Sequence, residues 1–244
     1  MDNVSSRLVP MVQKALFDFN MVLPGDRILV GLSGGKDSMA LLHALSALQA
    51  YHPGGFSLAA ASVHLGFEPH RYETVAGFCA GLGIPHAVLD AGLGTGLFLR
   101  VGADGSDAPC ALCARVRRAV LVRHAAEAGC ARLALGHNRD DAVETLFMRL
   151  TREGRIGSFA PVTDLSRSGI VQIRPLIYAP SGLVAAYCAE NGVPVVPSDC
   201  PAAGRTARAD AAAHIDAISR DIPDIRAKLF GAMLRDGRDG WSRR

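Results

Sequence analysis

Residues 27–46 read RILVGLSGGKDSMALLHALS, and this stretch decides the fold. Its apolar start predicts a short buried strand at 28–31, and the apolar residues after position 38 recur at helical spacing. The turn between them contains Gly34 and Gly35, which permit backbone conformations closed to bulkier residues and let a ligand approach the main chain. A helix that begins behind such a turn offers unpaired N–H groups and a partial positive charge. The stretch therefore predicts a phosphate-binding loop, with a glycine-rich turn that binds nothing as the alternative; its side-chain donors are Ser33, Lys36 and Ser38.

The type of phosphate loop follows from its spacing. The Walker pattern needs a glycine five residues before the Gly–Lys pair and Ser or Thr directly after the lysine, but Val30 and Asp37 stand at those places. The hexapeptide SGGKDS instead resembles the SGGxDS signature of the PP-loop superfamily, the N-type ATP pyrophosphatases that cleave ATP to AMP and pyrophosphate. It matches at every specified position. The resemblance implies that the loop residues hold the phosphates of ATP: Ser33, Gly34, Gly35, Lys36 and Ser38.

Composition limits the class of protein. The 244 residues are 49% hydrophobic, which is enough for a sizeable core. No apolar run approaches the roughly 20 residues that span a bilayer, and the N-terminus lacks the order of a signal peptide. We therefore expect a cytoplasmic protein that does not contact a membrane. The net charge of +3 does not by itself indicate nucleic-acid binding.

Strand and helix patterns alternate along the chain. Strand-like runs fall at 28–31, 57–65, 85–91, 131–136 and 170–176, and helix-like runs at 4–20, 69–82, 112–129, 142–150, 181–192 and 207–235. This alternation predicts an α/β fold, a doubly wound, mostly parallel five-stranded sheet with helices on both faces, plus N-terminal and C-terminal helices. Ligands of such sheets bind beyond the carboxyl ends of the strands, where the phosphate loop falls.

The same patterns suggest a division of the chain. We expect residues 1–24 to form an N-terminal helix, 25–200 the PP-loop ATP-binding α/β domain, and 201–244 a C-terminal helical extension. The glycine-rich run 92–109 has no convincing period, and connections of this length are usually functional or disordered. It opens an insertion, 92–118, that carries cysteines.

Residues 135–145 read LGHNRDDAVET and join a predicted strand to a predicted helix. Asp140 and Asp141 could therefore reach the same sheet edge as the phosphate loop, where two carboxylates beside bound ATP suit Mg²⁺. The alternative is that they cap the helix, which alone would explain one of them. The segment is similar to the GHxxDDxxET block of PP-loop tRNA-modifying enzymes. This resemblance implies that Asp37 or Asp141 holds Mg²⁺, and we expect the nucleotide to contact further residues at strand ends: His64, Gly136 and His137.

Six cysteines in a reducing compartment favour metal ligands, catalysts or core residues over disulfides. Cys110 and Cys113 have the spacing that lets two thiolates bind one metal or cluster, or form a redox disulfide. A four-cysteine zinc site would need a second such pair, which the chain lacks. Cys200 is the best-placed third cysteine, because it follows the last strand-like segment in a loop. The other three are expected to be packed core thiols: Cys79, Cys130 and Cys188.

Three further segments narrow the resemblance. CALCARVRR at 110–118 is similar to the C-x-x-C-x-x-x-R-R block of the tRNA 2-thiocytidine synthetase family. IRPL at 173–176 and IPDIRAKLFGAML at 222–234 resemble that family's strand end and C-terminal stretch. With gaps, the resemblance runs over most of residues 5–235. It implies a [4Fe-4S] cluster with one iron open for a sulfur species, held by Cys110, Cys113 and Cys200.

This chain departs from the family at one place. The family usually carries a second CxxC near the third ligand, where this sequence reads PSDCPAAGRT at 197–206. Ser198 and a single cysteine stand there, so the third ligand and the substrate are the least supported parts of the resemblance.

The resemblance also implies a reaction. A pyrimidine carbonyl oxygen, expected to be that of cytidine in tRNA, attacks the α-phosphorus of ATP, and sulfur from the cluster then replaces the adenylate. Expected partners are tRNA, a sulfur donor such as cysteine desulfurase or sulfide, and a second copy of the chain. The expected catalytic residues are Lys36, Asp37, Cys113 and Asp141.

Arginines supply two more expectations. Arg174 could bind the AMP phosphate or pair with a carboxylate, since arginine forks suit both. Arginines also gather at 115–123, 149–155 and 235–244, and such clusters either form a phosphate-tracking face or are ordinary solvated residues. The residues expected to neutralise RNA follow the cysteine pair: Arg115, Arg117 and Arg118.

Three alternatives remain open at this point. A lysidine-synthetase-like tRNA ligase shares SGGxDS and the aspartate pair but needs no cysteine pair. A cluster-free enzyme could use Cys110 and Cys113 for persulfide chemistry on a non-tRNA substrate. A nucleotide-binding regulator with decayed catalysis is disfavoured by the intact loop and aspartates. Iron content and an ATP-to-AMP assay separate these alternatives.

Overall fold

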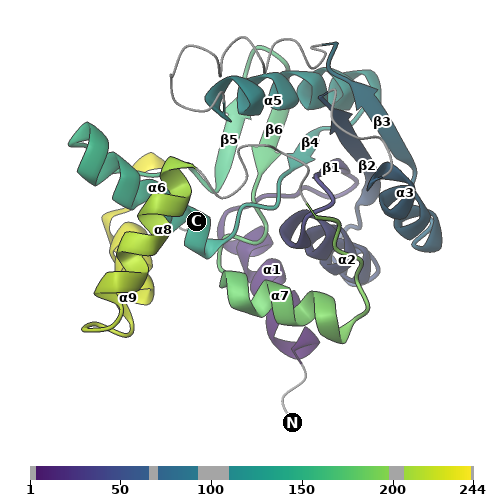
Figure 1. Ribbon diagram of the computed structural model, residues 1–244. Helices are drawn as coiled ribbons and strands as arrows, with labels where there is room; N and C mark the ends of the chain where they lie inside the picture. Colours follow the sequence, from purple (N-terminus) through teal and green to yellow (C-terminus); the bar gives the residue numbers. More distant parts are fainter. Residues whose placement is uncertain (1–3, 66–70, 93–109, 198–205, 243–244) are drawn as a thin grey trace.

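The computed structural model describes residues 4–65, 71–92, 110–197 and 206–242. Its strands form one sheet with the spatial order β3-β2-β1-β4-β6-β5, in which β5 runs antiparallel to β6 and the other neighbours are parallel (Figure 1). The strands are β1 (Arg27–Leu32), β2 (Ser57–His64), β3 (His86–Asp90), β4 (Arg132–Ala134), β5 (Val162–Leu165) and β6 (Ile170–Ile173).

The predicted fold class is confirmed. Leu29 of β1 pairs with Ala59 of β2 on one side and with Leu133 of β4 on the other, so the strand order reverses at β1. Open α/β sheets bind ligands outside the carboxyl ends of the strands at such a switch point. The predicted number of strands was one too few. The missed strand, β5, is a four-residue edge strand with two adjacent polar residues at its centre, too short to give a periodic signal.

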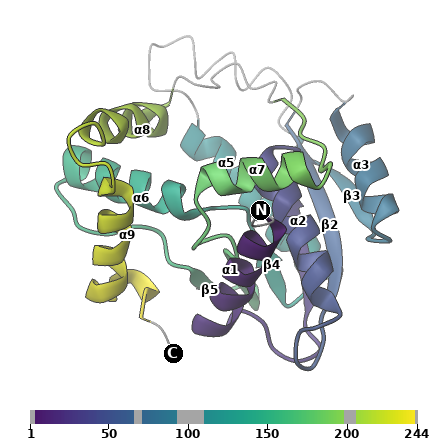
Figure 2. The same ribbon diagram turned by 90° about the horizontal axis from the view of Figure 1, so that it is seen from below.

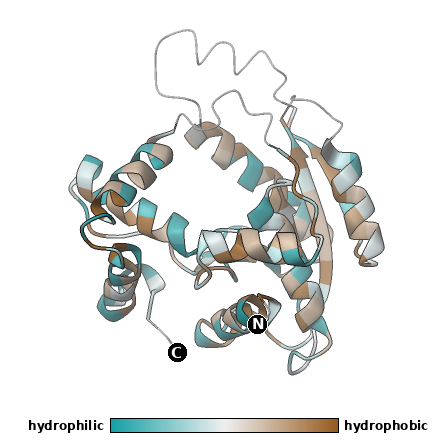
Figure 3. Ribbon diagram, turned by 60° about the horizontal axis from the view of Figure 1, so that its bottom comes forward, coloured by the Kyte–Doolittle hydropathy of each residue, from teal (hydrophilic) through white to brown (hydrophobic). Residues whose placement is uncertain are grey.

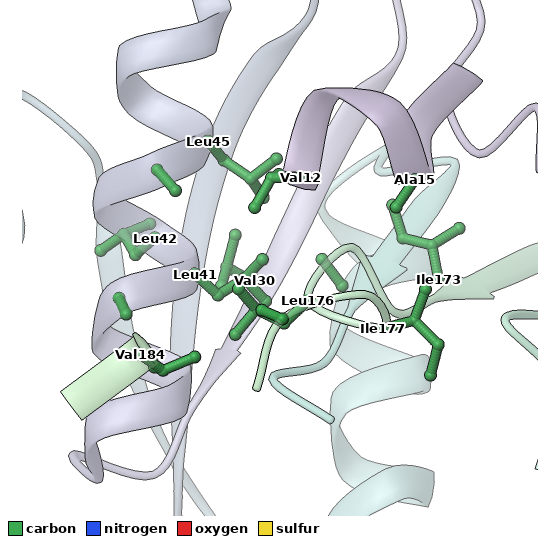
Figure 4. Close-up of a cluster of buried hydrophobic side chains, with 14 of the residues drawn as sticks. Val12, Ala15, Val30, Leu41, Leu42, Leu45, Ile173, Leu176, Ile177 and Val184 are labelled. Atoms are coloured by element: carbon green, nitrogen blue, oxygen red, sulfur yellow. The ribbon is translucent and has the colours of Figure 1, made fainter. Parts of the chain in front are cut away.

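One face of the sheet carries the larger core. It is covered by α1 (Ser5–Asp18), α2 (Lys36–Gln49), α3 (Arg71–Gly81) and α7 (Ser181–Glu190). Apolar side chains from three of these helices meet those of the strands in a continuous cluster that contains Val12, Val30, Leu41, Leu42, Leu45, Ile173 and Val184 (Figure 4). This packing fixes α2, and with it the phosphate loop, against the centre of the sheet.

The helix α5 (Cys110–Glu127) covers the opposite face (Figure 1). Leu29 and Leu133 point toward it and pack with Leu121 and Ala125, whereas Ile28 and Val30 point into the larger core. Strands buried on both faces read as continuous apolar runs, which explains the sequence of β1. In Figure 3 the strands are coloured mostly as apolar, whereas the helices around them carry both apolar and polar residues.

The C-terminal part packs beside the sheet. It comprises α6 (Arg139–Met148), the π-helical turn η1 (Arg149–Glu153), α8 (Ala207–Ile218), α9 (Ile225–Asp236) and the short η2 (Arg238–Gly240). A single helical stretch over 207–235 was predicted, and this was wrong: α8 and α9 are separate helices against α6 (Figure 2). Pro223 lies between them and removes a backbone donor.

A residue near the C-terminus packs against the segment that follows the first helix. Trp241 is 2% exposed and makes edge-to-face contacts with Phe19, after α1, and with Phe230 of α9. Such aromatic pairs stabilise by more than their buried area alone. Within the described ranges, none of the helices has both the length and the apolar character that crossing a membrane requires.

Candidate active site

The phosphate loop connects β1 to α2. Gly34 has a φ of +79°, a conformation that strongly favours glycine. Ser38 Oγ accepts a hydrogen bond from the Ser33 N–H at 3.1 Å and donates to the Gly35 carbonyl at 3.0 Å, so the loop folds around this hydroxyl. No described side chain caps the first amides of α2. Its N-terminus is therefore suited to an anion.

Gly136, after β4, touches the first turn of α2. A Cβ atom at this position would lie 2.9 Å from the carbonyl carbon of Asp37 and 2.9 Å from the nitrogen of Ser38. Both are backbone atoms, which cannot move away by a side-chain rotation. The absence of a side chain at Gly136 is what lets the ends of β1 and β4 share one site.

Asn138 connects the two segments chemically. It is 3% exposed and caps α6 by accepting hydrogen bonds from the N–H groups of Asp140 and Asp141 at 2.9 and 3.1 Å. In return Asp141 Oδ2 accepts the Asn138 N–H at 2.9 Å, and this completes a capping box. The Asn138 Nδ2 donates to Asp37 Oδ1 at 2.9 Å. Asn138 thus holds the carboxylate of Asp37 through its side chain and that of Asp141 through its backbone N–H, both at the same sheet edge.

Asp140, the other aspartate of the adjacent pair 140–141, makes different contacts. Asp140 Oδ2 accepts the N–H of Ser181, the first residue of α7, at 2.7 Å. Lys36 Nζ donates to both carboxylate oxygens of Asp37 at 2.8 Å and to Ser181 Oγ at 2.9 Å. Asp140 therefore anchors α7 beside the loop, while Lys36 is held next to Asp37.

The carboxylates of Asp37 and Asp141 fit a magnesium ion. Mg²⁺ takes one or two carboxylates and completes its octahedron with phosphate oxygens and water. Burial raises the pKa of Asp141 and Asp37 adds to this rise, while Arg208 and the Asn138 hydrogen bond oppose it. Within the described ranges, three or more His, Cys, Asp or Glu side chains nowhere gather as a metal site. A cation here would thus depend on phosphate oxygens as well.

A cavity of about 330 Å³ opens between the strand ends and α5. Asp37, Ser33 and Ser38 form one wall, and α5 forms the facing wall with Arg117 and Arg118. Its volume lies at the small end of ligand pockets. The cavity also has apolar lining from the ends of the strands and from α3, including Leu32, Val63, Leu65, Tyr72 and Leu135.

The helix α5, which begins with the cysteine motif, lines this cavity through Ala114, Arg117, Arg118 and Leu121, and Cys113 is not part of the lining. Cys113 is partly buried against the core on that face of the sheet, one turn before Arg117. Arg115 and Arg118 are exposed. Within the described ranges, no carboxylate pairs with any of the three arginines, so they leave this wall positive. Cys110 begins α5 but its side chain is outside the description, as is all of Cys200.

His137 lines the cavity next to Gly136. Its ring packs on Phe159 with centroids 5.1 Å apart. Burial, together with the positive charges of Arg174 and Arg208, lowers the pKa of His137 to about 3. The imidazole is consequently neutral at physiological pH and can offer a hydrogen bond but no charge.

Arg174 lies behind His137 and not on the lining. It is 5% exposed, its guanidinium carbon is 4.9 Å from the centre of the Phe159 ring, and its Nη1 donates to the Ala160 carbonyl and to Thr163 Oγ1. Burial lowers its pKa to about 10, with Arg118 contributing. Of the two alternatives for Arg174, pairing with a carboxylate is not seen within the described ranges.

The structure also places His64, the arginines of the 149–155 cluster and the three expected core thiols. His64 does not line the cavity; it packs edge-on against Tyr72, which does, with centroids 5.7 Å apart. Two arginines of the 149–155 cluster are neutralised, since Arg149 lies 3.8 Å from Asp239 and Arg152 lies 3.0 Å from Asp210. The expected core thiols are buried: Cys79, Cys130 and Cys188.

Three residues of the site were not predicted from the sequence: Asn138, Ser181 and Arg208. Asn138 carried a usable signal, because an asparagine directly before an acidic pair is a favoured helix cap. Ser181 and Arg208 carried none, since each reaches the site through tertiary packing. Arg208, in the first turn of α8, donates to Asp141 Oδ1 at 3.0 Å.

Comparison with known proteins gives the family. A model described as a PP-loop domain matches residues 6–200. A tRNA-cytidine(32) 2-sulfurtransferase of Syntrophotalea carbinolica is 34% identical over 234 residues, which cover 95% of this chain and 90% of that protein. The protein of the same name from an Anaeromyxobacter species is 35% identical over 231 residues, covering 94% and 76%.

A solved structure shares the fold. It is the U34-tRNA thiolase NcsA from Methanococcus maripaludis with its [4Fe-4S] cluster, with a TM-score of 0.77 and 22% identity over 95% of this chain and 79% of that chain. The solved structure supports the fold, and the sequence matches to named sulfurtransferases show that the chain is an enzyme. The chain belongs to the PP-loop domain family and, within it, to the branch that includes the tRNA-cytidine(32) 2-sulfurtransferases.

Proposed function

We propose that this chain is an ATP-dependent sulfurtransferase that acts on cytidine in tRNA. The observation that carries the proposal is a shared cavity: the phosphate loop with Asp37, which Asn138 links to Asp141, and the helix that begins with the cysteine motif border it. The relatives at 34% and 35% identity, named for tRNA cytidine, support the choice of substrate.

The first step would join the substrate to AMP. The carbonyl oxygen of the base forms a bond to the α-phosphorus of ATP, and the bond from that phosphorus to the bridging oxygen breaks, so pyrophosphate leaves. Phosphoryl transfer depends mainly on positioning and charge stabilisation. Mg²⁺, when bound by Asp37 and Asp141, would neutralise phosphate charge. The residues that hold the phosphates are Ser33, Gly34, Gly35, Lys36 and Ser38.

The nucleotide would extend from the loop along the strand ends. Gly136 leaves room for it, and the neutral His137 offers it a hydrogen bond. His64 would act through Tyr72, which it contacts. Arg174 would act through His137, whose pKa it helps to lower, and not by touching phosphate.

The second step would replace the adenylate with sulfur. A sulfur nucleophile adds to the carbon that carried the oxygen, and AMP leaves with that oxygen. We propose that Cys110, Cys113 and Cys200 hold a [4Fe-4S] cluster, which when bound supplies this sulfur. Positions 110 and 113 are one helical turn apart and lie on one face of α5.

Cys200 can reach the same region. The N–H of Val196 donates to the carbonyl of Gly34 at 2.9 Å, so this part of the chain passes beside the phosphate loop. Four residues span at most about 14 Å. A cysteine that follows Val196 by four residues is thus within reach of the cavity.

RNA would approach over α5. Arg115, Arg117 and Arg118 place positive charge there that no carboxylate of the described ranges neutralises, which suits a phosphate backbone, and a splayed base can enter a pocket of this kind. A cytoplasmic location, a sulfur donor such as cysteine desulfurase or sulfide, and a homodimer belong to the proposal, as does the division into 1–24, 25–200 and 201–244.

The test uses anaerobically purified protein with tRNA, ATP and sulfide. We expect AMP and pyrophosphate to form and thiolated cytidine to appear in digested tRNA by mass spectrometry. Asp37→Asn should abolish both. ATP turnover that requires free lysine, without thiolation, would show a lysidine-type ligase. Thiolation by iron-free protein would show that the reaction needs no cluster.

A further inference from the structure

Arg208 binds the one Asp141 oxygen that the capping box leaves open. Asp141 Oδ2 is taken by the N–H of Asn138 at 2.9 Å, and Oδ1 accepts Arg208 Nη1 at 3.0 Å. Arg208 is 43% and Asp141 20% exposed at the side chain. The guanidinium therefore stands where a cation shared with Asp37 would bind Asp141.

The position of Arg208 in its own helix is unfavourable without this contact. It is the second residue of α8, whose first turn is capped by Thr206 Oγ1 accepting the N–H of Ala209 at 3.2 Å. A helix N-terminus carries partial positive charge and disfavours an arginine. The contact with Asp141 offsets this repulsion, so removing it weakens the docking of the first turn.

We propose that Arg208 competes with the divalent cation for Asp141, so that binding of cation and nucleotide loosens the first turn of α8. The inference rests on the proposed function, because it needs the cation site formed by Asp37 and Asp141. Two cations at one carboxylate oxygen repel each other. Coupling between two binding events is reciprocal, so the cation must weaken the Arg208 contact as much as Arg208 weakens the cation.

Other contacts keep the C-terminal helices in place when Arg208 is changed. Arg226 of α9 lies 3.3 Å from Glu144 of α6 and 2.8 Å from Asp216 of α8. Arg152 lies 3.0 Å from Asp210, also in the first turn of α8, and its side chain is 50% exposed, close to the 43% of Arg208, although Asp210 at 60% is more exposed than Asp141 at 20%. Arg152→Gln is therefore a matched control, since it removes an ion pair to the same turn without touching the carboxylates.

The first measurement is calorimetric. Mn²⁺ is titrated into protein that is saturated with α,β-methylene-ATP. We expect Arg208→Gln to tighten Mn²⁺ binding by about two- to fivefold, the range for a half-exposed ion pair. Arg208→Lys should stay near wild type, and Arg152→Gln should be unchanged.

The second measurement is hydrogen exchange of the amides at 207–211. In the wild type, Mn²⁺ with the analogue should speed their exchange, whereas in Arg208→Gln exchange is already fast and does not change. Unchanged or weaker Mn²⁺ binding in Arg208→Gln, or slower exchange on binding, would overturn the competition. If Asp37→Asn and Asp141→Asn also leave Mn²⁺ binding intact, the proposed cation site fails with it; if they abolish it, only the competition fails.

Discussion

The side-chain amide of Asn138 donates to Asp37 Oδ1 at 2.9 Å, across 101 positions of sequence. This bond ties the helix after β4 to the phosphate loop after β1. The carboxylate of Asp141 accepts a hydrogen bond from the backbone N–H of the same asparagine. The carboxylates of Asp37 and Asp141 are thus held in place by a neutral residue.

Asn138→Ser separates helix capping from carboxylate positioning. Serine is a good cap, but it lacks the donor that reaches Asp37. We expect the free energy of unfolding to fall by about 1 kcal/mol, the net value of one hydrogen bond. Pyrophosphate release should fall by about two orders of magnitude, because a small misplacement of a catalytic group has effects of that size. Steady-state turnover and urea unfolding give the two values.

Asn191 supplies the control. It ends α7 and its side chain binds Ser5 and the Tyr187 carbonyl, away from the cavity. Asn191→Ser should leave turnover unchanged. If Asn138→Ser turned over ATP as fast as Asn191→Ser, Asn138 would be a helix cap and nothing more.

Gly136→Ala tests the close approach of the two strand ends. The new Cβ would stand 2.9 Å from backbone atoms of Asp37 and Ser38, so the loop must move. We expect a loss of about 1–3 kcal/mol in stability, as for other overpacked sites, together with weaker ATP binding. Unfolding is followed by the fluorescence of the single tryptophan, Trp241, and ATP binding by calorimetry.

Gly77→Ala is the companion variant. Gly77 lies in α3 with open space around the position of a Cβ, so alanine should stabilise by about 0.5–1 kcal/mol. Equal ATP affinity in Gly136→Ala and Gly77→Ala would show that the loop does not depend on this contact.

The neutral state of His137 predicts a dependence of stability on pH. Its pKa is about 3 in the folded protein and ordinarily 6.5, so below pH 6.5 the unfolded chain binds a proton that the folded chain does not. Stability therefore falls as the pH decreases from 6.5 toward 3. Between pH 7 and pH 5 this amounts to about 2 kcal/mol. Above pH 7 the residue should have no effect.

The measurement is urea unfolding of wild type and His137→Gln at both pH values. Subtracting one protein from the other cancels the contributions of other groups, among them Asp141 and Glu144, whose raised pKa values act in the opposite direction. The wild type should lose about 2 kcal/mol more than the variant on acidification. An equal loss in both proteins would mean that His137 titrates normally.

The cysteine motif predicts a coloured protein. Purified anaerobically, the chain should be brown with about four irons, and Cys113→Ser should be colourless. Cys79→Ala is the control, since Cys79 is buried in the core on the other face of the sheet, where burial raises its pKa to about 11. Iron retained in Cys113→Ser, or zinc in place of iron, would contradict the cluster.

Much of the fold could be predicted from local patterns. The apolar run of β1, the glycines behind it and the later strand–helix alternation define a doubly wound sheet, and its topology then requires the segments after β1 and β4 to meet. The structure brings Ser33, Asp37, Gly136 and His137 to one cavity accordingly.

The remainder depends on contacts that no local pattern records. Arg174 looks like a phosphate ligand in sequence, yet packing against Phe159 buries it behind His137. Arg208 belongs to a helix 67 positions beyond Asp141. Charge at a position can be seen in a sequence, whereas its burial and its partner are fixed only when distant elements pack.

The most direct test of the account is mass spectrometry of tRNA digested after incubation with ATP and sulfide under anaerobic conditions. If nucleotide and sulfur chemistry share one cavity, wild-type protein forms thiolated cytidine, while Lys36→Ala and Cys113→Ser each form none. Thiolated cytidine formed without Cys113, or ATP cleavage to AMP with no thiolated nucleoside in the wild type, would contradict it.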